Sequence, residues 1–438
     1  MASKTLSESH QADELLLPDD IARTVVSPRA HATPQRLHEA YTWARQNNPL
    51  GRIVLDGFDP FWLVTKHADV AAIGRDNTTF HNGDRPVVLQ PIAGIEYVKA
   101  MTGGKHHLVH SLVQLDEPEH KELRNLTQAW FMPGSILRLD ERMRALAKTT
   151  VDKMAACSGQ TTDFVAQVAL HYPLRVIMDI LGVPPYDETR MLKLTQEIFA
   201  PEDPELSRSK APVSPSERAN MVRGVVADFE RYFNQITADR RRHPRNDIAS
   251  LLANATINGQ PILDEHRLGY FIIIATAGHD TTSASISTAM WALATLPELL
   301  PQLKAEPSLI DGLINEAVRW GTPVRHFMRT ATVDTQIRGR QIHKGDWLML
   351  CYGSANRDEQ VFEQPFEFRL DRKPNRHLGF GHGAHVCLGQ HLAKMEMRKL
   401  FDEMLPRLAS VELMGEPALS VSNFVTGPKR LPVRYQLV

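Results

Sequence analysis

Cys387 lies in the segment 380–389, where glycines precede a thiol and a helical pattern follows it. Glycine tolerates positive φ and lets backbone lie close to a flat, bulky group; the glycines here are at positions 379, 381 and 383. After the cysteine, apolar residues recur at helical spacing, so we expect Cys387 at or just before a helix N-terminus. There the helix dipole and free N–H groups favour the thiolate over the thiol. The pattern therefore indicates a presented thiolate ligand, which is what a haem iron bound through sulfur requires.

Three other interpretations of this segment stay open from the residues alone. A lone cysteine is by default a small buried hydrophobic residue. Imidazole with thiolate suits zinc, although the spacing matches no paired-ligand pattern; the residues concerned are His377, His382, His385, Cys387 and His391. A glycine-rich phosphate loop at 379–383 would need a preceding strand and a later acidic residue, and both are missing.

An acid and two hydroxyls interrupt the most apolar helical stretch. Residues 277–282 read Ala-Gly-His-Asp-Thr-Thr and lie inside a helix expected over 265–296. A mid-helix glycine costs up to about 1 kcal/mol, and threonine hydroxyls that bond back to the main chain loosen a helix. We therefore expect a site at Asp280 and Thr281; the alternative is a helix end capped by Asp280. His279 is expected to be a hydrogen-bonded core residue.

Several charged residues admit both a functional and an ordinary interpretation. Glu316 and Arg319 are three residues apart in one predicted helix and so share a face. The apolar stripe of that helix faces the other way, so the pattern alone predicts an exposed ion pair. His120 and Arg124, one helical turn apart, could bind a carboxylate together, and Arg329 is a further candidate. Each of these cations is a surface residue by default.

Composition excludes several classes of protein. The 438 residues carry a formal charge of −1 at pH 7, so neither a nucleic-acid-binding surface nor an acidic tail is indicated. Three cysteines without paired spacing argue for a reducing compartment, and we expect a cytoplasmic protein in which Cys157 and Cys351 are structural. The N-terminus lacks the features of a signal peptide, and the apolar stretch 270–277 is far short of the roughly 20 residues that span a bilayer. No membrane partner is expected.

Helical patterns dominate, so the predicted fold class is mainly α with small β-sheets. We expect a loosely ordered segment over residues 1–20 and a single domain over 21–438, because no linker divides the chain. Residues 81–112 are expected to form a long irregular connection, and 200–216, which holds four prolines, a mobile hinge. The expected helices are 34–48, 67–73, 160–181, 191–199, 216–243 and 265–296. The expected strands are 52–55, 61–65, 335–338, 341–343, 347–351 and others within 419–438.

The thiol loop, the acid-alcohol helix and the Glu-x-x-Arg helix occur in a known order and at known distances. In these motifs the chain resembles the cytochrome P450 superfamily, over nearly its whole length. The likeness is greatest to soluble bacterial members that hydroxylate terpineol and to their relatives, in the stretches 274–282 and 375–387. The resemblance implies the P450 fold, with haem b between a long central helix and the cysteine-bearing loop. It also implies a monooxygenase that inserts one atom of O₂ into a C–H bond.

The resemblance assigns roles around the haem. Cys387 is implied as the axial ligand of the iron, and Phe380 and Gly389 are implied to lie beside it, with Phe380 shielding the sulfur. The residues implied to pair with the two haem propionates are His120, Arg124, Arg329 and His385.

Two motifs acquire a different meaning from the resemblance. Glu316 and Arg319 become a buried structural pair behind the haem instead of an exposed one, and the residues implied to reinforce them are Asn356 or Arg357 and Arg369. Asp280 and Thr281 match the acid-alcohol pair that relays protons to the bound oxygen. That pair argues against peroxide-dependent members of the family. It also argues against a haem sensor, which has no use for proton delivery.

Substrate and partners are implied as well. The pocket is expected to be walled by the loop 85–113, the segment 200–216 and the residues Ile273, Ala277, Val324, Phe327, Phe424 and Val425. Mostly apolar walls suit a small hydrophobic substrate, such as a monoterpenoid or an alkyl-aromatic hydrocarbon. The chain shows no flavin or iron–sulfur pattern, so electrons from NAD(P)H are expected through a reductase and a 2Fe-2S ferredoxin. The ferredoxin is expected to dock on a basic face near Cys387, with Arg124, Arg376 and Lys394 as candidates, and the enzyme is expected to be a monomer.

Overall fold

The computed structural model describes residues 15–438, and in this part short apolar runs from distant parts of the chain pair in one mixed sheet. β1 (Leu50–Ile53) and β2 (Phe61–Val64) form the predicted hairpin, and β2 also pairs in parallel with β10 (Trp347–Cys351). β7 (His326–Ala331) and β3 (Phe80–His81) complete the order β1-β2-β10-β7-β3. All residues of β2 and β10 are buried, as expected for strands covered on both faces.

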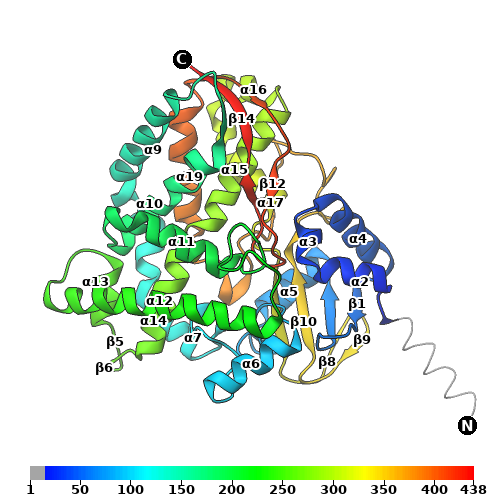
Figure 1. Ribbon diagram of the computed structural model, residues 1–438. Coiled ribbons are helices and arrows are strands. Elements are labelled where there is room, and N and C mark those ends of the chain that lie inside the picture. Colours follow the sequence, from blue (N-terminus) through cyan, green and yellow to red (C-terminus); the bar gives the residue numbers. More distant parts are fainter. Residues whose placement is uncertain (1–14) are drawn as a thin grey trace, which may run out of the picture.

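Short helices accompany this sheet on the right of Figure 1. They are α2 (Asp19–Val26), α3 (Pro28–His31), α4 (Pro34–Asn47), α5 (His67–Arg75) and α18 (Tyr352–Ala355). Of the segment 1–20 that was expected to be loosely ordered, residues 1–14 lie outside the described part. The rest is packed, because Leu17 is buried and its N–H donates to the carbonyl oxygen of Arg52 at 3.0 Å.

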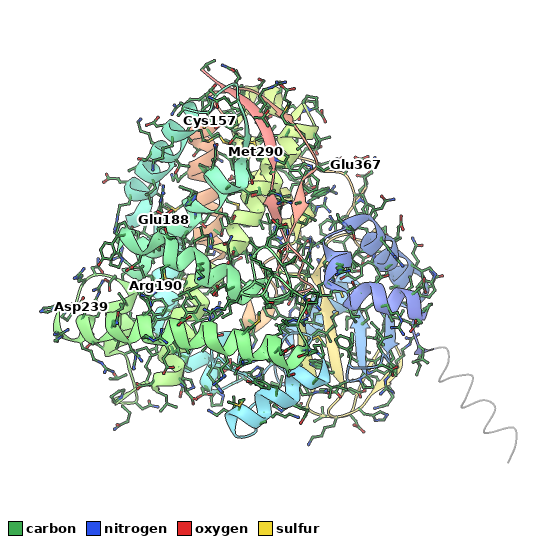
Figure 2. All side chains as sticks on the ribbon, in the orientation of Figure 1. Cys157, Glu188, Arg190, Asp239, Met290 and Glu367 are labelled. Atoms are coloured by element: carbon green, nitrogen blue, oxygen red, sulfur yellow. The ribbon has the colours of Figure 1, made fainter. Side chains whose placement is uncertain are left out.

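The larger, helical part lies on the left of Figure 1, and Met290 of α15 is fully buried inside it (Figure 2). Its helices before the central pair are α6 (Ile92–Thr102), α7 (Glu119–Gln128), α8 (Pro133–Ile136), α9 (Asp140–Ala155), α10 (His171–Leu181), α11 (Glu188–Phe199), α12 (Pro215–Arg242) and α13 (Ile248–Asn254). The central pair and the later helices are α14 (Asp264–Ala277), α15 (Asp280–Thr295), α16 (Leu299–Ala305), α17 (Ile310–Gly321) and α19 (Gln390–Met404).

The start of α12 shows how local sequence sets an element. Ser214 Oγ accepts from the Glu217 N–H at 3.3 Å, and Glu217 Oε2 accepts from the Ser214 N–H at 2.8 Å. This reciprocal capping box, with Pro215 in the first turn, satisfies amide groups that a helix start leaves without partners. The helix therefore begins one residue before the predicted position 216.

The remaining strands of the described chain form small sheets outside the mixed one. A three-stranded sheet has the order β11-β14-β4, and two-stranded pairs form between β12 and β13, β5 and β6, and β8 and β9. Their bounds are β4 (Thr161–Asp163), β5 (Thr256–Ile257), β6 (Gln260–Pro261), β8 (Thr335–Ile337), β9 (Arg340–Ile342), β11 (Leu408–Leu413), β12 (Ala418–Leu419), β13 (Pro428–Arg430) and β14 (Pro432–Leu437). The predicted fold class, mainly α with small sheets, is confirmed.

Three predicted boundaries are wrong in part. The connection expected over 81–112 contains α6, which ends at Gly103 in the left-handed conformation. The helix expected over 160–181 begins as β4 and continues through a π-helical turn, Val165–Ala169, before α10. The helix expected over 265–296 is divided into α14 and α15. Within residues 15–438, no helix combines the length and the apolar character that crossing a bilayer requires.

Candidate active site

Cys387 lies three residues before α19, where the sequence places it. Its N–H donates to the carbonyl oxygen of Phe380 at 2.8 Å, which closes the loop. Gly383 has a φ of 78°, and a Cβ there would lie 2.1 Å from the carbonyl oxygen of Gly74 at the end of α5. Glycine is thus required at 383 by its backbone conformation and by the close approach of α5.

The Cys387 side chain is enclosed by protein but exposed to a cavity. Burial raises the pKa of its thiol, and the Gly389 amide and the Arg124 charge offset this only in part. The Gly389 amide and the Arg124 charge act in the direction that the sequence analysis expects of the helix terminus, but desolvation outweighs them while no metal is bound, and the favoured thiolate stays a prediction. A thiolate here needs a cation bound to the sulfur, as a coordinating metal provides.

That cavity has a volume of about 490 Å³ and extends from the cysteine loop to α14 and the C-terminal loop. Its walls are mostly apolar, and its size is typical of small-molecule sites. Phe327 and Phe424 pack edge to face in it, with ring centroids 5.3 Å apart. The residues expected to form the substrate pocket all line it, namely Ile273, Ala277, Val324, Phe327, Phe424 and Val425.

The cationic residues expected near the haem propionates also line this cavity: His120, Arg124, Arg329 and His385. Arg124 Nη2 donates to the carbonyl oxygen of Val386 at 2.9 Å, and Arg329 Nη1 to that of Met328 at 2.8 Å. Within the described residues, neither guanidinium forms an ion pair with a carboxylate. The rings of His120 and His385 are 4.1 Å apart, and the buried Nδ1 of His120 has no hydrogen-bond partner in the described chain.

Burial lowers the pKa of each of these cations, and that of His385 falls to about 2 because Arg329, His120 and Arg124 add to the effect of burial. A buried guanidinium without a carboxylate partner is unfavourable. A ligand that carries carboxylates would supply the missing partners. The donor set therefore fits haem, whose propionates are carboxylates and whose iron is the cation that a thiolate at Cys387 requires.

The acid-alcohol motif lies at the break between α14 and α15. A Cβ on Gly278 would lie 2.8 Å from the Ile177 side chain, so any larger residue here would force that side chain to shift. Thr281 Oγ1 donates to the carbonyl oxygen of Ala277 at 2.8 Å, the backward bond that the sequence analysis expects. The helix does end here, but the Asp280 side chain makes no capping bond.

Asp280 and Thr281 face different spaces. Thr281 lines the main cavity, whereas Asp280 lines a smaller cavity on the side of Lys429 and Ser420. Asp280 Oδ2 is buried without a hydrogen-bond partner in the described chain, and it lies 3.6 Å from His279 Nδ1. His279 is fully buried and hydrogen-bonded to Thr195 and to the carbonyl oxygen of Leu170, as a core histidine.

Glu396 is a polar residue of the cavity that the sequence analysis missed. It lies on α19, only 2% exposed, and hydrogen-bonds Thr282 of α15. Burial raises the pKa of its carboxyl well above the ordinary value, and the hydrogen bond with Thr282 opposes this only in part. Its position nine residues after Cys387, on the apolar face of a predicted helix, is the signal that could have found it.

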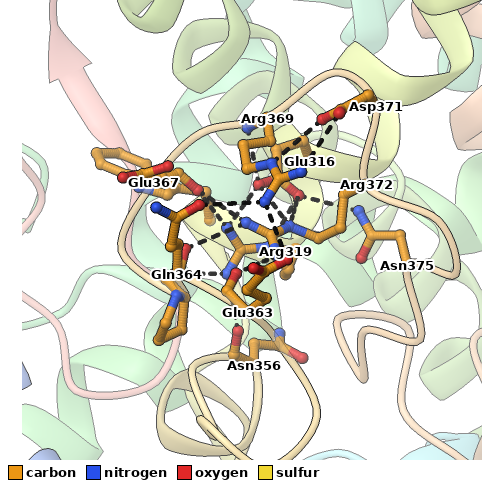
Figure 3. Close-up of polar contacts among 12 residues, drawn as sticks. Glu316, Arg319, Asn356, Glu363, Gln364, Glu367, Arg369, Asp371, Arg372 and Asn375 are labelled. Atoms are coloured by element: carbon orange, nitrogen blue, oxygen red, sulfur yellow. Dashed lines mark hydrogen bonds and ion pairs between the residues drawn. The ribbon is translucent and has the colours of Figure 1, made fainter.

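Glu316 and Arg319 form a closed network (Figure 3). Both side chains are fully buried, so the exposed pair that spacing favours is wrong and the buried pair that the resemblance implies is correct. Arg319 also donates to the carbonyl oxygens of Asn356, Pro365 and Glu367.

The cation that reinforces this pair is Arg372, because its Nε lies 3.1 Å from Glu316 Oε1. Arg369, expected in this role, contributes only its backbone N–H, and its side chain pairs with Asp371. Arg357 donates to the carbonyl oxygen of Trp320 instead.

The histidines that suggested zinc do not converge on Cys387. His377 hydrogen-bonds the Gly379 N–H, and His382 hydrogen-bonds Arg75. In the described chain, the residues close enough together to hold a metal ion are His81, Asp84 and Asp116, none of them from the thiol loop.

The proposed docking cations differ in exposure. Arg376 is exposed, whereas Arg124 and Lys394 are half-buried, and Lys394 Nζ lies 5.3 Å from the ring centroid of Phe380. Arg124 thus belongs to the cavity wall more than to an outer face.

Comparison with known proteins agrees with this geometry. The family model described as Cytochrome P450 matches residues 93–432, and the chain belongs to that family. It is a P450 monooxygenase, and membership implies a haem iron.

The similar proteins include terpenoid oxidases. The chain is 46% identical over 420 residues to "Cytochrome P450-terp" of Pseudomonas sp, covering 96% of this chain and 98% of the relative. It is 30% identical over 405 residues to linalool 8-monooxygenase of Pseudomonas putida, covering 92% and 96%. The crystal structure of CYP108D1 from Novosphingobium aromaticivorans superposes with a TM-score of 0.89 at 45% identity, covering 97% of this chain and 100% of that one.

Proposed function

We propose that this enzyme hydroxylates a small hydrophobic substrate, a monoterpenoid or an alkyl-aromatic hydrocarbon, with O₂ and two electrons from a 2Fe-2S ferredoxin. The observation that carries the proposal is one mostly apolar cavity that contacts both Cys387 and the helix break at Thr281. The relatives named for terpenoid oxidation support the same substrate class.

The chain's own residues hold the cofactor in this proposal. Cys387 would bind the iron of haem b through its sulfur, with Phe380 and Gly389 beside that sulfur. The propionates would pair with the four cationic residues of the cavity wall, of which Arg124, Arg329 and His385 have no carboxylate partner in the described chain and His120 has only Glu117, at 3.8 Å. When bound there, the haem supplies the activation of O₂ and the transfer of one oxygen atom to a C–H bond.

Proton supply is assigned to Asp280 and Thr281. The overall reaction consumes O₂, two electrons and two protons, and gives the alcohol and one water. The Asp280 carboxyl borders the smaller cavity and has an oxygen free to accept a proton, while the Thr281 hydroxyl borders the main cavity. The two residues therefore move protons across the helix without opening the apolar cavity to water.

The partner assignments follow the same proposal. An acidic 2Fe-2S ferredoxin docks near Cys387 on a face that includes Arg376 and Lys394, and a reductase supplies it from NAD(P)H. The enzyme works as a cytoplasmic monomer.

Two measurements test the proposal. The reduced carbon monoxide adduct of the purified protein should show the haem-thiolate absorbance, and Cys387→Ala should lose it. Terpenes and alkylbenzenes should shift the iron spin state, and the ligands that do so should yield alcohols with ferredoxin and reductase. A colourless protein, or an unchanged spectrum in Cys387→Ala, would reject the haem assignment; failure of all such ligands would reject the substrate class.

A further inference from the structure

An ion pair lines the mostly apolar cavity described above. Arg218, near the start of α12, pairs through Nη1 with Oε1 of Glu202, which lies between α11 and α12. Both residues line the cavity, and their side chains are 24% and 21% exposed. Burial raises the pKa of the Glu202 carboxyl, although the Arg218 charge opposes this.

The Arg218–Glu202 pair and Cys387 line the cavity from different sides. α12 packs on α6, α11, α13 and α14, whereas α19, which follows Cys387, packs on α9 and α17. Tyr97 Oη donates to Asn220 Oδ1 at 2.8 Å, which fixes the start of α12 against α6. A substrate in the cavity can therefore present one end to the side of Cys387, where the haem would lie, and the other end to Arg218 and Glu202.

Arg218 and Glu202 can form further hydrogen bonds beyond those between them. Arg218 Nε is buried without a partner, and within residues 15–438 neither side chain has a polar contact beyond the pair itself. Arg208, ten residues before Arg218, is fully engaged by Glu197 Oε2 at 2.7 Å and Asp228 Oδ2 at 2.6 Å, and it does not line the cavity. Incompletely satisfied charged groups in an apolar wall are costly unless a ligand completes their bonds.

We propose that Arg218 and Glu202 bind the hydroxyl group of a substrate alcohol. The inference rests on the proposed function and narrows it from hydrocarbons to mono-alcohols. The guanidinium donates to the hydroxyl oxygen, and the hydroxyl donates to the Glu202 carboxylate. Because the pair is already neutral, it suits a neutral polar group, whereas a carboxylate ligand would face the Glu202 charge. The carbon that is oxidised then lies at the end of the substrate away from its hydroxyl.

The test compares α-terpineol with limonene, which has the same carbon skeleton without the hydroxyl. Binding to the haem-containing enzyme is followed by the change in spin state. The variant is the double substitution Glu202→Gln with Arg218→Met, which leaves no unpaired buried charge. Asp228→Asn is the control, because it weakens the neighbouring Arg208 contact outside the cavity.

We expect the wild-type enzyme and Asp228→Asn to bind the alcohol at least roughly tenfold more tightly than the hydrocarbon, as hydrogen bonds to charged groups allow. In the double variant this preference should disappear through weaker alcohol binding, with limonene binding unchanged. An unaltered preference, or equal losses for both ligands, would overturn the inference while leaving the proposed function intact. If neither ligand shifted the spin state of the wild-type enzyme, the proposed function and this inference would fail together.

Discussion

Arg319 donates two parallel hydrogen bonds to Glu316, from Nε to Oε2 at 2.8 Å and from Nη2 to Oε1 at 2.6 Å, and both side chains are fully buried. Breaking a buried pair leaves an unpaired charge, so we expect Glu316→Ala to cost about 3–5 kcal/mol of unfolding free energy. Urea unfolding of the purified protein measures this. Asp371→Ala removes only the exposed contact to Arg369 and should change stability little; equal effects of the two substitutions would contradict the structural role of Glu316.

Two glycines of the cysteine loop differ in whether they can be replaced by alanine. Gly383 has a positive φ and a crowded Cβ position, whereas a Cβ on Gly389 would meet nothing within 4 Å. Positive φ alone costs roughly 1–3 kcal/mol for other residues. We expect Gly383→Ala to lower both stability and the haem-to-protein ratio, and Gly389→Ala to retain both. Comparable haem content in the two variants would show that the contact with Gly74 is not required.

Glu396 predicts a pH dependence of stability. A carboxyl whose pKa is raised by folding contributes stability that is fully present below its ordinary value, 4.5, and is lost as pH rises through the folded value. The neutral Glu396→Gln lacks this titration. We therefore expect the unfolding free energy of the wild type to fall relative to Glu396→Gln as pH rises from about 4.5. Parallel pH profiles would mean that Glu396 is not held protonated.

Thr281→Ala tests the proton relay. The substitution removes the hydroxyl that lines the cavity, so we expect several-fold less product for each NAD(P)H consumed and more peroxide. Thr281→Ser keeps the hydroxyl and should keep the coupling. Unchanged coupling in Thr281→Ala would remove this residue from the relay.

Ferredoxin docking is tested best at Arg376, because this side chain is exposed near the cysteine loop. Arg376→Glu should slow haem reduction severalfold at low salt, with the difference shrinking as salt screens the charges. The control is Arg242→Glu, the same charge change at the exposed end of α12. Equal rates for the two variants would exclude Arg376 from the docking face.

How far the sequence could predict this site depends on whether the signal is local. The Cys387 loop and the start of α19 were predictable, because glycine conformation and helical spacing act within a few residues. Glu316 and Arg319 were not predictable from spacing, since their burial comes from the segment 356–375, which folds over a face that periodicity alone marks as exposed. Glu396 was missed because its partner Thr282 lies on α15, which is far from α19 in the sequence.

The same distinction between local and distant signals explains which parts of the fold could be predicted. The glycines and prolines within 81–112 suggested an irregular connection, yet α6 forms there because it packs on α12, and Ile95 and Val98 are buried. The division between α14 and α15, by contrast, falls within 277–282, where the sequence places an acid and two hydroxyls in the helix, so this break was indicated locally.

The segment 200–212, part of which borders the cavity, is held to the rest of the protein more firmly at its start than at its end. Asp203 is fully buried and accepts from Lys429 Nζ at 2.9 Å and from the Val421 N–H at 2.9 Å, whereas residues 208–212 are largely exposed. The stretch 200–208 is therefore held in place, at Asp203 by the C-terminal loop and at Arg208 by its ion pairs with Glu197 and Asp228, whereas residues 209–213 form no ion pair in the described chain. Substrate would then enter and leave past residues 209–213, and exchanging these residues among relatives should change the rates of substrate entry and release without changing the shape of the cavity.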